Sequence, residues 1–134
     1  MGMYTELIVG AKLKQETPVE VIHILSFMLG ENTPCPPLDV SREFDHKFFK
    51  TERWRFMLSC SSYYFGFPKS TSVFKLDEIN GSYVISTRSS FKNYDNELEL
   101  FIDWFRKYVD CGSGQHDIFA MSIYEEEREY TFYK

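Results

Sequence analysis

Several features that mark common protein classes are missing from this chain. Its three cysteines, Cys35, Cys60 and Cys111, form no CxxC pair and no cysteine–histidine spacing typical of a zinc site. It has no export signal at its start and no apolar run approaching the roughly 18 residues that span a bilayer. Basic residues are not in excess either, because the net charge is -5. We therefore expect a cytoplasmic protein with reduced cysteines, no metal and no cofactor, and neither membranes nor nucleic acids as partners.

Aromatic residues, in contrast, are abundant. The 134 residues include 13 Phe, 9 Tyr and 2 Trp, which is enough large apolar surface for one well-filled core. A chain of this length has the usual size of one domain and needs no disulfide or metal to be stable. The sequence therefore predicts a single domain over residues 1–134.

The first third of the chain predicts a strand followed by a helix. Apolar and polar residues alternate from Tyr4 to Leu13, as in a half-buried strand. Thr17 and Glu20 have the spacing of a capping box, and an apolar arc then continues to Gly30, which is placed to end the helix in a left-handed conformation.

The rest of the chain predicts further strands and a second helix. Alternation of Trp54, Phe56, Leu58 and Cys60 with polar residues predicts a strand over 53–60. A hairpin is predicted over 72–88, with Asn80-Gly81 forming a type I′ turn. The second helix begins near Asn96, whose side chain is expected to cap it, and buries Phe101, Trp104, Phe105 and Tyr108. A last strand over 118–124 and a β-like tail over 130–133 complete the chain.

The resulting order is β-α-β-β-β-α-β, with a further strand at the C-terminus as an option. Two helices with one apolar arc each, set among alternating strands, predict an α+β two-layer sandwich. Its sheet is mainly antiparallel, both helices cover one face, and the topology is related to ferredoxin-like proteins.

The two ends of the chain carry a family resemblance. Met3-Tyr4-Thr5-Glu6 at the start, and Tyr124-Glu125-Glu126 with Thr131-Phe132-Tyr133 at the end, resemble the ends of small uncharacterised bacterial and prophage proteins. The resemblance covers only the termini. It implies a bacterial or phage origin and carries over no activity and no site residue.

The sheet face away from the helices is the first candidate binding surface. On a strand over 53–60, Arg53, Arg55 and Met57 point to that face, where arginines suit the carboxylates or aromatic rings of a partner. An equally weighted alternative is that the arginines only pair with acidic neighbours such as Glu6. The aromatic run that begins with Tyr63 and Tyr64 adds a second possible contact surface, although a core role is favoured for it.

The second candidate is the long connection over 31–47, since loops of this length are often functional. It contains Asp45 and His46, which would need a further residue such as His116 to form a metal or hydrolytic site. No known catalytic spacing is present, so the sequence favours a non-enzymatic protein-interaction module. The alternative is a small-molecule-binding or hydrolytic enzyme domain with its pocket at the 31–47 loop.

Overall fold

The computed structural model of the protein describes residues 4–39, 41–61, 72–110, 118–127 and 129–134. The elements in chain order are β1 (Thr5–Lys12), α1 (Val19–Met28), η1 (Arg42–Phe44), η2 (Lys47–Lys50), β2 (Val73–Asp77), β3 (Ser82–Phe91), α2 (Glu97–Phe105), η3 (Arg106–Tyr108), β4 (Ala120–Tyr124) and β5 (Thr131–Tyr133). Within the described ranges, five antiparallel strands form one sheet in the order β2-β3-β1-β4-β5.

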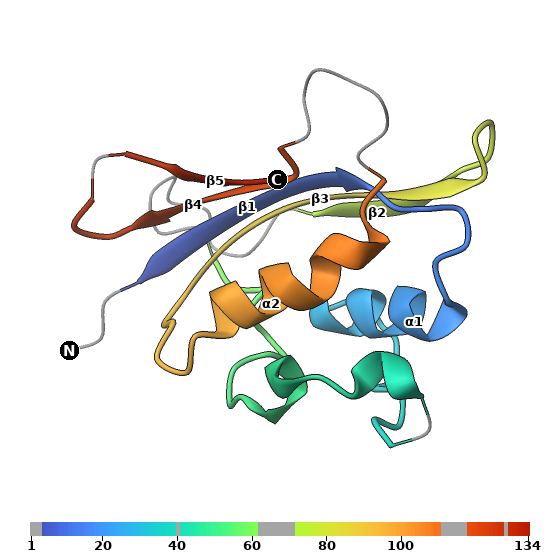
Figure 1. The fold of residues 1–134 in the computed structure, drawn as a ribbon, viewed down its shortest axis with the longest axis horizontal. Helices are drawn as coiled ribbons and strands as arrows, with labels where there is room; N and C mark the ends of the chain where they lie inside the picture. The colour runs from blue at the N-terminus through green and yellow to red at the C-terminus, as the bar shows by residue number, and fades with distance from the viewer. Residues whose placement is uncertain (1–3, 40, 62–71, 111–117, 128) are drawn as a thin grey trace.

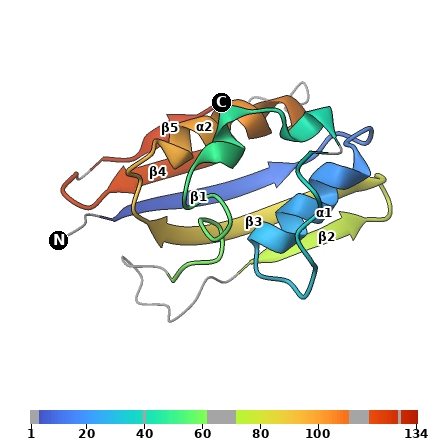
Figure 2. The same cartoon turned by 90° about the horizontal axis from the view of Figure 1, so that it is seen from below.

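Both helices lie on the same face of the sheet (Figure 1). In the view from that side, α1 lies over β3 and β2, and α2 lies on the side of β4 and β5 (Figure 2). The segment with η1 and η2 covers the helices on the side away from the sheet (Figure 1). The predicted α+β sandwich with a mainly antiparallel sheet is therefore confirmed, whereas the relation to ferredoxin-like proteins stays a prediction.

Local sequence explains β1 and α1. Leu7 and Val9 of β1, and Leu13 directly after it, belong to the core and are fully buried or nearly so. The predicted capping box is wrong, because no described side chain caps α1 and the Thr17 hydroxyl instead donates to the Lys14 carbonyl at 2.6 Å. Gly30 has the predicted left-handed conformation, with φ of 79°, where a Cβ would be strained.

The predicted strand over 53–60 is wrong. This segment forms successive turns, in which Phe56 N donates to the Arg53 carbonyl and Ser59 N donates to the Phe56 carbonyl. Its buried residues are Trp54, Met57 and Leu58, a spacing of one helical turn, while Phe56 is 48% exposed. Positions 54 and 58 fit both the alternation of a strand and the spacing of a helical turn, so the sequence alone favoured a strand. The contacts of Trp54 with α1 and η2 favour the turns.

The predicted hairpin is confirmed, but its turn type is not. β2 and β3 pair from Asp77 and Ser82 outward, and the four residues between them form the turn, closed by Gly81 N donating to the Asp77 carbonyl at 2.8 Å. Only Gly81 has a positive φ, 69°, so Asn80 does not take the type I′ conformation. Asn80 Nδ2 instead donates to the Asp77 carboxylate, and this bond holds the pKa of Asp77 below its usual value.

The start of α2 also differs from the prediction. Asn96 is the capping residue but has a left-handed backbone, φ 60°, and makes no capping side-chain bond. Asn93 replaces it, because its Oδ1 accepts from Leu98 N at 2.9 Å. The four residues predicted to face the core from this helix are all buried, in α2 and in η3, which follows it: Phe101, Trp104, Phe105 and Tyr108.

An aromatic cluster joins the η segment to the helices. Phe48 stacks on Trp104 with ring centroids 5.9 Å apart, and Phe49 meets Trp104 edge-on at 5.0 Å. Trp54 meets Phe49 edge-on at the same distance of 5.0 Å. These contacts hold η2 against α2, so core packing anchors the backbone of this segment.

Candidate functional site

Arg53 does not lie on the open sheet face, because the segment over 53–60 forms turns and not the predicted strand. Its Nη1 lies 3.4 Å from the buried Glu97 carboxylate and 3.7 Å from Asp95, and its guanidinium covers the Tyr94 ring at 4.9 Å. Its backbone N also donates to Glu97. Arg53 therefore pairs with acidic residues, as the alternative interpretation held, but at the start of α2 and not with Glu6.

The other residues of that predicted surface are also placed elsewhere. Arg55 covers the Trp54 ring at 4.9 Å and donates to the Cys35 sulfur at 3.5 Å. Met57 is fully buried in the core. Tyr63 and Tyr64 lie outside the described residues, as does His116. The structure thus does not bring the predicted arginine surface together on the sheet.

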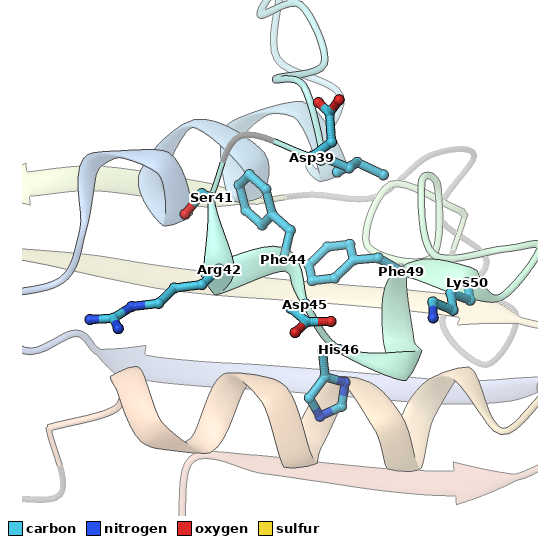
Figure 3. A pocket seen from close by; sticks show the side chains of 9 residues that line it. Asp39, Ser41, Arg42, Phe44, Asp45, His46, Phe49 and Lys50 are labelled. Carbon is cyan, nitrogen blue, oxygen red and sulfur yellow. The ribbon is translucent and has the colours of Figure 1, made fainter.

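The 31–47 loop does contribute to a hollow, of about 550 Å³, which extends over η1 and η2. The rings of Phe44 and Phe49 lie side by side at its centre, while Arg42 and Lys50 lie toward opposite ends (Figure 3). The hollow is lined by Leu38, Asp39, Ser41, Arg42, Phe44, Asp45, His46, Phe49 and Lys50. Its aromatic floor and mixed-charge rim suit a small, partly apolar molecule.

His46 has a structural role in this hollow. Its Nδ1 accepts a hydrogen bond from Phe48 N at 3.0 Å, which caps η2, so in the neutral ring the proton is on Nε2. Nε2 then donates to Asp103 Oδ2 at 2.8 Å, and the ring points toward α2 (Figure 3). With both nitrogens engaged, His46 as placed has no lone pair left to accept a proton from a bound substrate.

The described residues offer no metal site. No three histidine, cysteine, aspartate or glutamate side chains in this part of the chain lie close enough together to hold an ion. Cys35 and Cys60 are free thiols, and burial raises the pKa of Cys60, which disfavours its nucleophilic thiolate. In the same part of the chain, no helix combines the length and apolar character needed to cross a bilayer.

The outer edge of β2 is a different kind of candidate site. The backbone carbonyl of Tyr83 in β3 accepts a hydrogen bond from Leu13 N and is therefore directed to the β1 side. Successive residues of a strand direct their backbone groups to opposite sides. Val84 therefore faces β2 and pairs with Lys75, which leaves the backbone groups of Phe74 and Leu76 directed away from the sheet. Among the described residues, no strand pairs with this side of β2.

A groove accompanies this edge. It has a volume of about 420 Å³ and lies between α1 and the paired aromatic residues Phe74 and Tyr83, whose ring centroids are 5.2 Å apart. Its lining is formed by Thr17, Val19, Ile22, His23, Ser26, Glu31, Phe74 and Tyr83. Leu76, next along the same face of β2, is 44% exposed. An extended chain beside β2 would therefore find both backbone partners and apolar surface.

The comparisons with known proteins add no relative. No protein family matches the chain, and no curated protein and no solved structure gives a significant match. The candidate sites consequently depend on their geometry alone.

Sequence reasoning missed the β2 edge and the groove. The strand itself was predicted from the Asn80-Gly81 turn and the apolar residues on either side. Its position at the edge depends on the strand order, which no local pattern encodes. The available signal was Lys75 between Phe74 and Leu76, since lysine is typical of edge strands.

Proposed function

We propose that this protein is a non-enzymatic protein-interaction module that binds an extended segment of its partner at the β2 edge. The observation that carries the proposal is the outward direction of the Phe74 and Leu76 backbone groups beside the α1–β2 groove. In strand addition, backbone hydrogen bonds supply affinity and alternate side chains enter pockets on one face. Phe74, Tyr83 and Val19 would contact those alternate side chains.

A longer edge strand suits this role better than a short one. β2 has five residues, whereas β5 at the opposite edge has three, and short edge strands are a common protection against pairing. A groove also lies beside β2. These two features together favour β2 over β5 as the binding edge.

The hollow over η1 and η2 supports small-molecule binding as a second candidate function. The observation in its favour is the fixed Phe44–Phe49 pair, with ring centroids 5.4 Å apart, on the floor of a hollow of about 550 Å³. A hydrolytic reaction there would need a base other than His46, because both ring nitrogens are engaged. Small-molecule fragments that bind the wild type but not a folded Phe49→Ala variant would show that this hollow is the binding site.

The strand-addition proposal is tested by selecting displayed heptapeptides on the wild-type protein and measuring their binding to Leu76→Pro. Proline removes the outward N–H of Leu76 and is tolerated at the solvent side of an edge strand. Leu76→Val keeps the N–H and an apolar side chain, and is therefore the matched control. We expect Leu76→Pro to abolish binding and Leu76→Val to retain it.

Two further measurements complete this test. Amide spectra must show that Leu76→Pro keeps the fold, and bound peptide should slow hydrogen exchange at Phe74 and Leu76 but leave Lys75, already paired with β3, unchanged. Selected peptides that bind Leu76→Pro as well as wild type would refute strand addition, and so would a selection that yields no binder.

A further inference from the structure

We propose that the segment bound at the β2 edge has an acidic residue between two apolar residues. This inference rests on the proposed function, because it specifies the partner at the same edge. The occupant is an extended segment of another protein, with its acidic side chain beside Lys75 and its apolar side chains on the groove side.

The pattern follows from the alternation of side chains along β2. Phe74 lines the groove with residues of α1 and so lies on the face that the helices cover, Leu76 shares that face, and Lys75 between them lies on the opposite, open face. Lys75 is exposed and forms no ion pair with any described residue. The edge therefore presents one positive charge, unpaired within the described part of the chain, between two apolar side chains.

A strand added to β2 must match this alternation, because residues directly opposite each other in a sheet lie on the same face. The residue opposite Lys75 is on the open face, and its two neighbours are on the groove side. Opposite charges stabilise such a pair and like charges destabilise it. An acidic residue there, between apolar neighbours, is the complement that the edge selects.

The same argument disfavours a second copy of this chain. Two β2 strands paired about Lys75 would place the two lysines directly opposite each other. The total charge of -5 on each copy adds to the repulsion. A segment of another protein with a single acidic residue avoids the lysine–lysine contact. Physiological salt screens the repulsion between that residue and the net negative charge of this protein beyond about 8 Å.

The test compares two peptides, Ser-Thr-Ile-Glu-Val-Thr-Ser and the same peptide with Lys in place of Glu, on wild-type protein and on Lys75→Glu. Binding is followed through the amide resonances of Phe74 and Leu76 at physiological salt. We expect wild type to bind the Glu peptide about fivefold more tightly than the Lys peptide, the factor that corresponds to a cross-strand charge pair. Lys75→Glu should reverse the preference. Lys47→Glu, which changes an exposed lysine on η2, is the matched control and should leave it unchanged.

Other outcomes overturn the inference. Equal binding of both peptides at Phe74 and Leu76 would refute the acidic preference but leave strand addition intact. Resonance changes confined to other regions would refute the acidic preference. Together with a heptapeptide selection that yields no binder, they would also refute strand addition. Sedimentation of the free protein provides the last check, since a dimer with protected Phe74 and Leu76 amides would assign the edge to a second copy.

Discussion

The guanidinium of Arg53 lies 3.4 Å from the carboxylate of Glu97, which is 0% exposed. Glu97 also accepts from Arg53 N at 3.2 Å and from Asp95 N at 2.9 Å. The first residue of α2 thus fixes the turn segment that begins at Arg53, 44 positions earlier in the chain. Removal of one partner from such a buried pair leaves the other incompletely paired.

Glu97→Gln should therefore reduce the free energy of unfolding by about 1–3 kcal/mol, the usual cost of a lost buried bond to a charged group. The measurement is urea unfolding at pH 7. Glu52→Gln is the control, because Glu52 also lies near Arg53, at 3.9 Å, but is largely exposed. Equal losses of unfolding free energy in the two variants would show that the burial of Glu97 adds nothing to the contribution of its ion pair.

Trp104→Ala should be among the most destabilising substitutions in this chain. The side chain is 1% exposed, contacts Phe48 and Phe49, and donates from Nε1 to the Glu43 carbonyl at 2.8 Å. Truncation of a buried aromatic residue costs about 3–5 kcal/mol. Trp104→Phe should lose less, because it keeps most of the ring contacts. A denaturation midpoint of Trp104→Ala near that of wild type would contradict the observed packing.

Most of the sheet and both helices could be predicted from sequence because their signals are local. Alternation identifies β1, and Asn80-Gly81 with apolar residues on either side identifies the hairpin. The arc through Phe101, Trp104 and Phe105 identifies α2. The segment over 53–60 could not be assigned in this way, because Trp54 and Leu58 fit both a strand and a helical turn and only tertiary contacts separate them.

The candidate sites were harder to predict than the elements. Asp45 and His46 line a hollow over η1 and η2, and their role as a site stays a prediction, whereas the partner of His46 is Asp103, 57 positions away on the polar side of α2. Such a pair becomes evident only after α2 and η2 have packed together. The β2 edge likewise depends on the strand order, which is a property of the complete sheet.

Gly81→Ala should destabilise the hairpin, whereas Gly10→Ala should not. Gly81 has φ of 69°, which costs a residue with a Cβ about 1 kcal/mol or more. Gly10 lies within β1, where an added Cβ would meet no described atom within 4 Å beyond its chain neighbours, so alanine there fits and lowers the entropy of the unfolded chain. Thermal unfolding of the two variants provides the comparison. A loss of stability in Gly10→Ala equal to that in Gly81→Ala would contradict this explanation.

Alkaline pH should weaken the fold through Tyr108. Its hydroxyl donates to the Glu43 carboxylate, and burial, together with this bond and the nearby negative charge, raises the pKa of Tyr108 above its ordinary value of 10. The folded state therefore retains the phenol proton at a pH where the unfolded chain has lost it. The resulting stability is fully present below pH 10 and decreases as the pH rises above that value.

Urea unfolding between pH 8 and pH 11 tests this linkage, with absorbance at 295 nm reporting tyrosinate. Tyr108→Phe should be less stable than wild type at pH 8, since Glu43 loses a donor, but its stability should decrease less steeply above pH 10. A part of the alkaline slope should remain, because burial also raises the pKa of Tyr124 and of Tyr133. Parallel curves for wild type and Tyr108→Phe would show that Tyr108 ionises as freely in the folded protein as in the unfolded chain.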